Sequence, residues 1–491
     1  MAEIALSAGP SRAGPWSLVI PAGMYERLRQ HLFPGDGDEH GAVIAAGMAT
    51  GTDGAVRLLS RDLFLAADGQ DYVPGQRGYR MLTAEFIRKR IKYCRDQKLV
   101  YLAIHNHGGH NSVCFSGDDL RSHERGYPAL LDITGSLPVG ALVFAPDAVA
   151  ADIWLPGGAR TPITHATIVG ASRRVLRSAP VSETFARHAK YDRQARLFGD
   201  AGQAILGRAK IAIIGLGGVG SIIAELSAHL GVGKFVLIDP DRFELTNHPR
   251  VVGATRWDAL PCLLRPVLPV WARRGMSSFA TRKTLIAARV IRRPNPDARI
   301  NIINRNVADP EAARALLDCD YIFLAADTAT ARLIFNQVVN QYLIPGVQIG
   351  SKISTDKETG DISNVFSIVR PASSEHGCLW CNELINPAHL QEEAQQEEER
   401  RAQRYLDEDE VPTPSVITLN AVGAAHAAND FLFYMTGLTS PDAARSYQLH
   451  LPAERRTVMN IPRRDSHCPE CGSGFTSRRA QGDACSLTTR A

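Results

Sequence analysis

Four side chains that together could form a catalytic metal centre lie between residues 105 and 119. His105 and His107 are separated by one residue, and Ser116 and Asp119 follow after a short loop. Catalytic zinc usually takes three nitrogen or oxygen ligands from the protein and keeps a fourth position for water, whose pKa the metal lowers. His105, His107 and Asp119 supply three such ligands, so the pattern predicts a hydrolytic zinc site.

The predicted elements around these residues can bring them together. The apolar run 100–104 is typical of a buried strand, and histidines at positions i and i+2 at its end project to the same side. Ser116 is suited to cap a helix that begins near Gly117, which places Asp119 in its first turn. We therefore expect the three ligands to converge at one strand end.

The order His-x-His, short loop, Ser-x-x-Asp resembles the JAB/MPN (JAMM) metalloprotease family over about residues 15–160. In that family a glutamate from an earlier strand acts as general base and acid, and the serine hydroxyl stabilises the oxyanion. The resemblance implies these catalytic roles for Glu39, with Asp38 as its rival, and for Ser116.

The chain departs from the family pattern at two places. Gly108 stands where the family usually has proline, and the loop to Ser116 is one residue longer than usual. The longer loop leaves Asp118 as a competitor of Asp119 for the metal. We expect His110 and His123 to be solvent-exposed residues of a loop and a helix.

The second half of the chain contains a glycine-rich turn between a buried strand, 209–214, and an apolar helix that runs to Leu230. Its glycines are Gly215, Gly217, Gly218 and Gly220. Such glycines let the backbone approach a phosphate while the helix N-terminus offers free N–H groups. A second strand, 234–239, ends in Asp239, which is positioned to bind ribose hydroxyls. The pattern predicts a nucleotide site.

Further polar residues surround this core and distinguish a nucleotidyl transferase from a dehydrogenase. They are Arg193 before the first strand, Asn247 and Arg250 after the second, Lys283 at a helix start, and Asp327 and Arg332 after the strand 321–325. Adenylyl transfer to a carboxylate builds charge on the α-phosphate and on pyrophosphate, which fixed cations and magnesium must meet. Hydride transfer has no such need.

These residues resemble the ThiF family of ATP-dependent adenylyltransferases, relatives of ubiquitin-activating enzymes, over about residues 187–475. The resemblance implies ATP and Mg²⁺ as cofactors, with Asp239 on the ribose and Asp327 on Mg²⁺. It implies phosphate contacts for Asn247, Arg250 and Lys283. It also implies a homodimer, in which Arg193 reaches the partner's nucleotide. The Pro-rich run 260–271 is inserted relative to the family.

Two Cys-x-x-Cys pairs, Cys378 with Cys381 and Cys468 with Cys471, predict a second metal site. Four thiolates form a closed, structural zinc site. A redox pair would usually occur singly near a βαβ start, and disulfides would suit a secreted protein.

Thioester-forming relatives carry a cysteine in the crossover region between the two cysteine pairs. In this chain the region contains a charge run over 391–410, which we expect to form a solvated helix and a mobile acidic loop. Residues 410–420 contain no cysteine; Thr413 and Ser415 lack the thiol chemistry that forms thioesters. Cys262, Cys319 and Cys485 are weak candidates, since nothing beside them indicates a lowered pKa.

Length and composition are those of a multidomain globular protein. The 491 residues carry a net charge of +4 with 22% charged residues, and no basic, aromatic-interleaved patch indicates nucleic acid. No membrane-spanning stretch or signal segment is predicted, so we expect a cytoplasmic protein. We expect an N-terminal domain over 1–165, a linker over 166–186, an adenylation domain over 187–475 and a flexible tail over 476–491.

The predicted architecture is α/β: a JAB-type domain followed by a Rossmann-like ThiF-type domain with a four-cysteine zinc lobe. Together the two resemblances imply adenylation of the C-terminal glycine carboxylate of a ubiquitin-like protein, coupled with zinc-dependent trimming or deconjugation of that protein, and allow a conjugating enzyme as a further partner. One alternative is an adenylyltransferase for a sulfur-carrier protein or small peptide without thioester formation. A second alternative is a metal-free scaffold with a degenerate JAB domain.

Overall fold

The computed structural model describes residues 14–75, 78, 80–135, 137–181, 188–259, 279–355, 362–394, 414–474 and 476–489. The chain divides into two compact units. The first unit comprises Met1–Ile168, Val175–Val181 and Ala480–Ala484, and the second unit comprises Val169–Arg174, Ser182–Arg479 and Cys485–Ala491. Among the helices of the described residues, none has the length and apolarity needed to cross a membrane.

A mixed eight-stranded sheet forms the centre of the first unit. The strand order is β1-β3-β2-β4-β5-β6-β7-β8, and β1 also pairs with β7. The strands are β1 (Trp16–Pro21), β2 (Gly41–Thr50), β3 (Val56–Leu65), β4 (Val100–Asn106), β5 (Val139–Ala145), β6 (Ala148–Trp154), β7 (Arg160–Val169) and β8 (Arg173–Leu176). The central strand β4 pairs antiparallel with β2 and parallel with β5.

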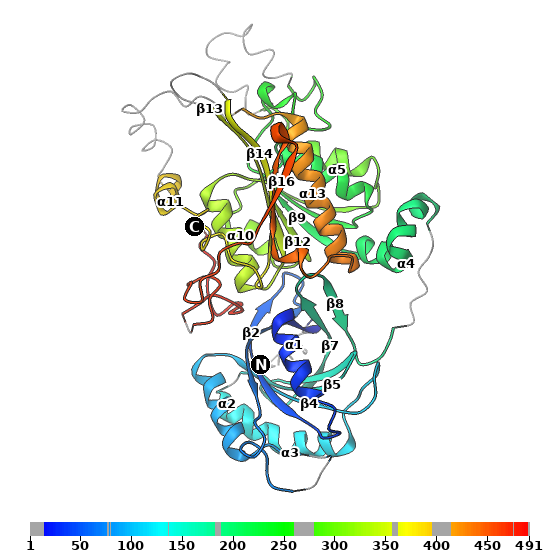
Figure 1. Cartoon of the computed structure of the whole chain (residues 1–491), viewed down its shortest axis with the longest axis vertical. Helices are drawn as coiled ribbons and strands as arrows, with labels where there is room; N and C mark the ends of the chain where they lie inside the picture. Colours follow the sequence, from blue (N-terminus) through cyan, green and yellow to red (C-terminus); the bar gives the residue numbers. More distant parts are fainter. Residues whose placement is uncertain are drawn as a thin grey trace, which may run out of the picture. The chain divides into compact units, whose positions relative to one another are not determined.

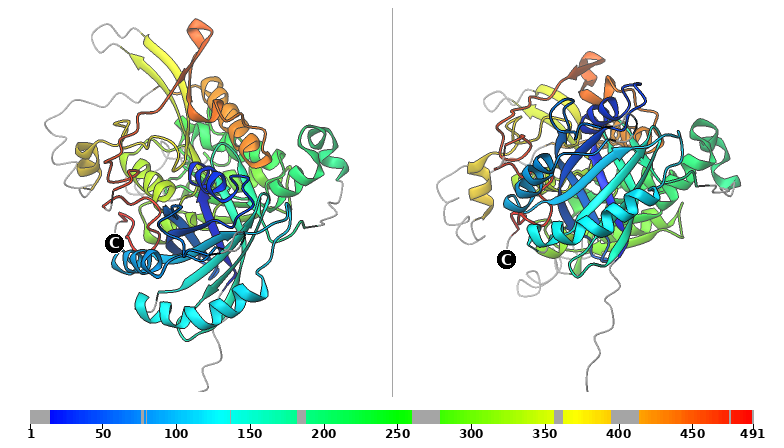
Figure 2. Two further views of the ribbon diagram at one scale, coloured as in Figure 1. Left: turned by 60° about the horizontal axis from the view of Figure 1, so that its bottom comes forward. Right: turned by 90° about the horizontal axis from the view of Figure 1, so that it is seen from below.

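Helices cover both faces of this sheet. Side chains of α1 (Ala22–Leu32) share one core cluster with Leu102 and Ile104 of β4. The opposite cluster contains Tyr101 of β4 with residues of α2 (Ala84–Asp96) and α3 (Gly117–Thr134); Figure 2 shows α3 running along the sheet. Because strand residues alternate between faces, His105 follows Tyr101 toward the side of α3.

The second unit contains a sheet with the strand order β11-β10-β9-β12-β13-β14-β15-β16. Its strands are β9 (Lys210–Ile214), β10 (Lys234–Ile238), β11 (Arg299–Ile303), β12 (Tyr321–Leu324), β13 (Gly346–Thr355), β14 (Ile362–Ala372), β15 (Tyr447–Leu451) and β16 (Arg456–Asn460). The strands from β11 to β13 are parallel, and β14 to β16 continue the sheet antiparallel. The parallel part has the order of a Rossmann-like sheet.

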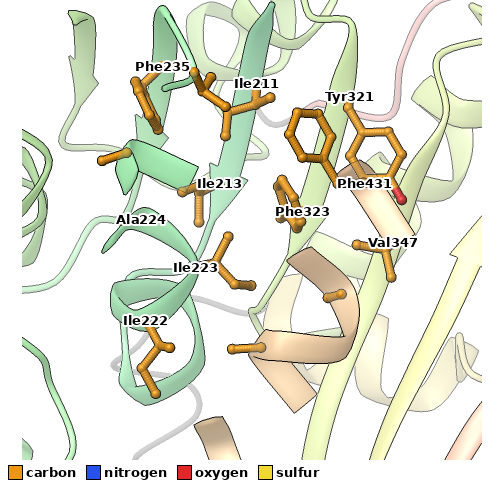
Figure 3. Packing of buried hydrophobic residues seen from close by; sticks show 14 of the residues in the cluster. Ile211, Ile213, Ile222, Ile223, Ala224, Phe235, Tyr321, Phe323, Val347 and Phe431 are labelled. Carbon is orange, nitrogen blue, oxygen red and sulfur yellow. The ribbon is translucent and has the colours of Figure 1, made fainter. Parts of the chain in front are cut away.

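Helices also cover both faces of the second sheet (Figure 1). One face is covered by α5 (Gly218–His229), α8 (Lys283–Arg292) and α13 (Ile417–Thr436), which share the main apolar cluster. Figure 3 shows Ile223 of α5 and Phe431 of α13 packed against Ile213 and Phe323 of the sheet. Figure 1 shows α10 (Ala329–Gln341) on the other side of the sheet. In the chain, α9 (Pro310–Leu316) precedes β12 and α4 (Asp192–Arg208) precedes β9.

Part of the segment expected to be a linker, 166–186, forms strands, while its residues 182–186 lie outside the described residues. Residues 160–169 form β7 and residues 173–176 form β8. In β7, Ile163, Ala166 and Ile168 are buried while the basic and polar residues between them are more exposed. This half-buried alternation has too few apolar residues to stand out in the sequence, which is why the strand was missed.

The segment expected to be a flexible tail is hydrogen-bonded along part of its length. The pairing of β2 with β4 ends at Ala46, which leaves the outer edge of Met48 free for another partner. Gly482 bridges to Met48, the N–H of Asp483 donates to the Met48 carbonyl at 2.8 Å, and the N–H of Thr50 donates to the Asp483 carboxylate at 2.8 Å. The tail thus continues the sheet edge at β2.

Candidate functional site

The three predicted metal ligands of the first unit converge. The Nε2 atoms of His105 and His107 lie 3.2 Å apart, and each lies 3.3 Å from a carboxylate oxygen of Asp119. Ligand atoms about 2.0–2.1 Å from a tetrahedral zinc are separated by roughly 3.3 Å. The spacing of the three donors therefore fits a zinc ion, and these residues form one of the two candidate metal-binding groups among the described residues.

The surrounding hydrogen bonds orient these ligands. Nδ1 of His107 lies 3.1 Å from the Cys114 carbonyl oxygen, so a proton on Nδ1 leaves Nε2 free for a metal. Ser116 is the N-cap of α3: its Oγ accepts the Asp119 N–H at 3.1 Å, and its own N–H and hydroxyl donate to the Asp119 carboxylate at 2.7 Å. The predicted cap thus fixes the position of Asp119.

The surroundings of the two acids of this site, Asp119 and Glu39, shift their pKa values in opposite directions. Burial favours a raised pKa for Asp119, but hydrogen bonds from His105 and Ser116 outweigh it and hold that pKa well below its ordinary value. A carboxylate oxygen of Glu39 lies 3.7 Å from Nε2 of His107. Burial raises the pKa of Glu39, against the opposing effect of the two histidines. Asp119 therefore stays ionised, as a metal ligand must be, while Glu39 is more easily protonated.

The rival residues lie elsewhere, and one expectation was wrong. Asp118 is exposed and pairs with Arg121 at 2.5 Å, and Asp38 accepts the N–H of Gly78 at 2.9 Å. His110 is exposed, as expected. His123 is buried rather than exposed, because it stacks on Tyr127 inside the α3 face, and burial lowers its pKa to about 4.

A cavity of about 1020 Å³ lies at the carboxyl ends of β9, β10 and β12 in the second unit. Gly215, Gly217 and Gly218 line it, together with Val219 of α5. Gly215 has φ +88°, a conformation that favours glycine, and a β-carbon there would lie 2.8 Å from the Ala326 backbone nitrogen. The loop can thus approach a bound phosphate closely.

Acidic and basic side chains meet in this cavity. Both carboxylate oxygens of the buried Asp239 accept backbone N–H groups, from Leu216 at 2.6 Å and from Asp241 at 2.8 Å. Burial raises the pKa of Asp239, although nearby Lys283 opposes this. Lys283 itself donates to the Asp241 carboxylate at 2.7 Å. The remaining predicted residues that line the cavity are Arg250, Asp327 and Arg332.

Three predicted residues lie outside the described lining of the cavity. Asn247 is buried in a short 3-10 helix (Leu245–Asn247), where its side-chain oxygen accepts the N–H of Glu244 at 3.2 Å. Gly220 is buried within α5. Arg193 is exposed on α4. Asn247 and Gly220 instead contact residues that line the cavity: the Asn247 carbonyl accepts the N–H of Arg250 at 3.0 Å, and Gly220 lies against the Gly215 carbonyl.

The sequence did not predict several polar residues that line the cavity. Lys352 of β13 and Arg370 of β14 add two cations, and Arg370 donates to Gln348 at 2.9 Å while its guanidinium lies 4.6 Å from the Tyr447 ring centre. Asn420 of α13 also lines the cavity. Its side-chain oxygen accepts a hydrogen bond from the Ser351 hydroxyl at 2.6 Å, and its side-chain N–H donates to the Ser415 hydroxyl at 3.1 Å.

The four cysteines of the two pairs form the second candidate metal group of the described residues. All four are buried, and three neighbouring Sγ–Sγ distances are 3.6, 3.7 and 3.6 Å. Sulfurs about 2.3 Å from a tetrahedral zinc lie roughly 3.8 Å apart. Backbone N–H groups of Cys381 and Glu470 donate to Sγ of Cys378 and Cys468 at 3.4 Å. The group fits a structural zinc ion.

The candidate thioester cysteines are placed as follows. Cys319 is buried between α9 and β12, just before the strand in which it was expected, and Cys485 is half-buried. Cys262, the inserted run and most of the charged crossover segment lie outside the described residues; the beginning of the charge run belongs to α11 (Pro387–Ala394). Within the described lining of the nucleotide cavity there is no cysteine.

Comparison with known proteins identifies the family. Residues 191–470, more than half of the chain, match the ThiF family, so the chain belongs to this family. It is 27% identical over 157 residues to tRNA threonylcarbamoyladenosine dehydratase of Escherichia coli (strain K12), covering 32% of this chain and 51% of that protein. It is 25% identical over 183 residues to ubiquitin-like modifier-activating enzyme 5 of Xenopus laevis, covering 35% and 39%.

These curated relatives are matched over about half of their length or less. Among solved structures, E. coli MccB with succinimide shows a TM-score of 0.44 and 18% identity, covering 58% of this chain and 75% of that chain. MccB with ATP shows a TM-score of 0.43 and 19% identity, covering 59% and 76%.

Proposed function

We propose that the second unit adenylates the C-terminal carboxylate of a ubiquitin-like protein with ATP. The observation that carries the proposal is the nucleotide cavity, where a glycine loop lies beside the acids Asp239, Asp241 and Asp327. The five cations that line the same cavity are Arg250, Lys283, Arg332, Lys352 and Arg370. A relative is named as an activating enzyme for ubiquitin-like modifiers, which supports this class of substrate.

The charges of the cavity match the reaction. A carboxylate oxygen of the substrate bonds to the α-phosphorus of ATP, and the bond from that phosphorus to the bridging oxygen breaks, so that acyl-AMP and pyrophosphate form. Negative charge shifts toward pyrophosphate, and fixed cations such as Lys283 and Arg250 lower the barrier by stabilising it. Asp239 would bind the ribose, and Asp327 would bind Mg²⁺, which supplies further neutralisation of the phosphates.

We further propose that the first unit is a JAB/MPN-like zinc isopeptidase domain. His105, His107 and Asp119 would hold the zinc, which supplies a bound water of lowered pKa. Glu39, beside His107, would take the proton of that water and pass it to the leaving amine. The Ser116 hydroxyl, now donating to Asp119, would turn toward the developing oxyanion. This domain would trim or deconjugate the same partner whose tail the second unit activates.

ATP–pyrophosphate exchange tests the proposal directly. Full-length protein should catalyse exchange only when a ubiquitin-like protein ending in glycine is present. Lys283→Ala should lower the exchange rate at least 100-fold, because it removes a cation from the cavity. Lys234→Ala, an exposed lysine at the far end of β10, is the control that should retain exchange. Exchange that is equally fast without any carrier protein would reject the proposal.

The second candidate is adenylation of a small peptide or sulfur-carrier protein without a thioester. The lack of a cysteine in the described lining of the cavity favours it. Replacing every cysteine outside the two Cys-x-x-Cys pairs by serine should then leave acyl-AMP formation intact, with no DTT-sensitive adduct from either protein. A DTT-cleavable adduct on the unmodified protein that disappears in the variant would exclude this candidate.

A further inference from the structure

The second unit contains another cavity, of about 400 Å³, that shares no lining residue with the nucleotide cavity. It is lined by Tyr321, Gly346 and Ala372, which are the first residues of β12 and β13 and the last residue of β14. These residues mark the end of the sheet opposite to the nucleotide cavity. Its volume is in the range of small-molecule pockets.

Most of the wall of this cavity is apolar. Phe433, Leu438, Met459 and Pro371 line it together with the ring of Tyr321. Tyr321 belongs to the aromatic cluster with Phe431 and Phe323, and Figure 3 shows its hydroxyl pointing away from Phe323. A wall of this kind would bury the apolar or aromatic body of a ligand.

Three lining residues present buried polar atoms without a hydrogen-bond partner. They are Oδ2 of Asp430, the hydroxyl of Tyr434 and Oγ1 of Thr439. Tyr434 is only 6% exposed. Asp430 and Tyr434 are four residues apart on α13, so they lie on one face of the helix. Since buried polar groups are nearly always satisfied and no described residue hydrogen-bonds to these three atoms, they can serve as acceptors for a ligand from outside the protein.

The charged residues that line the cavity indicate whether the missing partner is a cation or an anion. Asp430 is the only Asp, Glu, Lys or Arg in the described lining, which otherwise contains two histidines, His376 and His426. Burial raises the pKa of Asp430 to about 7 by desolvating its carboxylate, and none of the described residues that line the cavity is a Lys or Arg that could offset this cost. A bound cation would remove that cost.

We propose that this cavity is a second ligand site, which binds a small molecule with an aromatic or apolar body and a protonated primary amine. An ammonium group has three donors and no acceptor. The Asp430 carboxylate and the hydroxyl oxygens of Tyr434 and Thr439 provide three acceptors. The proposal is independent of the adenylation chemistry, because the two cavities lie at opposite ends of the sheet.

Three probes with related bodies and different heads test the proposal: 2-phenylethylamine, 2-phenylethanol and 3-phenylpropionate. Binding to the full chain is measured by saturation-transfer NMR and calorimetry at pH 8. We expect the amine to bind at least tenfold more tightly than the alcohol, with no binding of the carboxylate. ATP should not displace the amine. Equal affinity for amine and alcohol, or absence of binding by every probe because water alone fills the cavity, would overturn the proposal.

Variants assign the binding to this cavity. Asp430→Asn keeps the shape of the side chain and should weaken amine binding at least tenfold, while alcohol binding is unchanged. Tyr434→Phe provides a second test that does not depend on the folding of the first variant, with an expected loss of about threefold. Asp297→Asn, an exposed aspartate elsewhere on the second unit, is the control. Unchanged amine affinity in both cavity variants would contradict the assignment.

Discussion

A β-carbon at Gly220 would overlap the carbonyl oxygen of Gly215. The first turn of α5 therefore lies directly against the backbone of the glycine loop, and the loop keeps its shape only while residue 220 has no side chain. Because Gly215, Gly217 and Gly218 line the nucleotide cavity, this close backbone approach is what holds the predicted phosphate-binding surface in place.

Gly220→Ala should therefore destabilise the second unit and weaken ATP binding together. Overpacking of a tight core position costs about 1–3 kcal/mol, so thermal unfolding should shift to lower temperature. Gly217→Ala is the matched control, because a β-carbon there meets nothing within 4 Å. Gly217→Ala should retain the wild-type melting temperature, whether or not it changes ATP binding. Equal melting temperatures for the two variants would show that the overlap is relieved at no cost.

Local patterns predicted the parts of each site that are adjacent in sequence. The glycine loop, the Ser116 cap and the two cysteine pairs each have their signal within a few residues. Lys352 and Arg370 reach the cavity only because β13 pairs with β12 and β14 pairs with β13, and no local pattern encodes these strand pairings. His123 is different: Asp119, His123, Tyr127 and Leu131 are buried at four-residue steps, so helical periodicity could have indicated its burial.

Zinc content separates the two metal sites. Wild-type protein should contain about two zinc ions per chain, one in each group of ligands, and Asp119→Ala should lose about one because it removes a ligand of the first site. Asp118→Ala should retain both, since Asp118 is exposed and pairs with Arg121. Elemental analysis after extensive dialysis measures this. Identical zinc content in wild type and Asp119→Ala would support the metal-free scaffold alternative.

Substitution of Cys471 should affect the four-cysteine site of the second unit. Cys471 is fully buried among the other three thiols. Cys471→Ser should remove about one zinc per chain and lower the melting temperature of the second unit by several degrees, because ligand loss removes part of the folding free energy. Cys485→Ser, which changes a half-buried cysteine outside the group, is the control. A Cys471→Ser protein with wild-type zinc and wild-type melting would reject the structural role.

His123 should make the stability of the first unit depend on pH. Burial lowers its pKa from an ordinary value of 6.5 to about 4. Between these values the unfolded chain binds a proton that the folded chain does not, so stability is fully present above pH 6.5 and falls as pH drops toward 4. Zinc-free His123→Phe should lose less stability than zinc-free wild type between pH 7 and pH 5, measured by urea unfolding at each pH.

The comparison for this test is His110→Gln, which changes an exposed histidine of the same unit. It should follow the wild-type pH profile more closely than His123→Phe does, because it leaves the buried imidazole of His123 in place. If His123→Phe also follows the wild-type profile, the buried imidazole does not account for the acid sensitivity.

Substitution of Arg370 tests whether a cation of the antiparallel strand β14 takes part in the reaction proposed for the nucleotide cavity. Burial lowers the pKa of Arg370, so the protein bears a desolvation cost there that a bound anion would offset. Arg370→Gln keeps a hydrogen-bonding group beside Gln348 but removes the charge, and we expect it to lower kcat/KM of ATP–pyrophosphate exchange about 10- to 100-fold. Arg370→Lys should restore part of this loss. Arg456→Gln, an exposed arginine of β16 that pairs with Glu454, should match wild type. If Arg370→Gln melts like wild type and exchanges at the wild-type rate, Arg370 positions only Tyr447 and Gln348 and does not belong to the anion-binding part of the cavity.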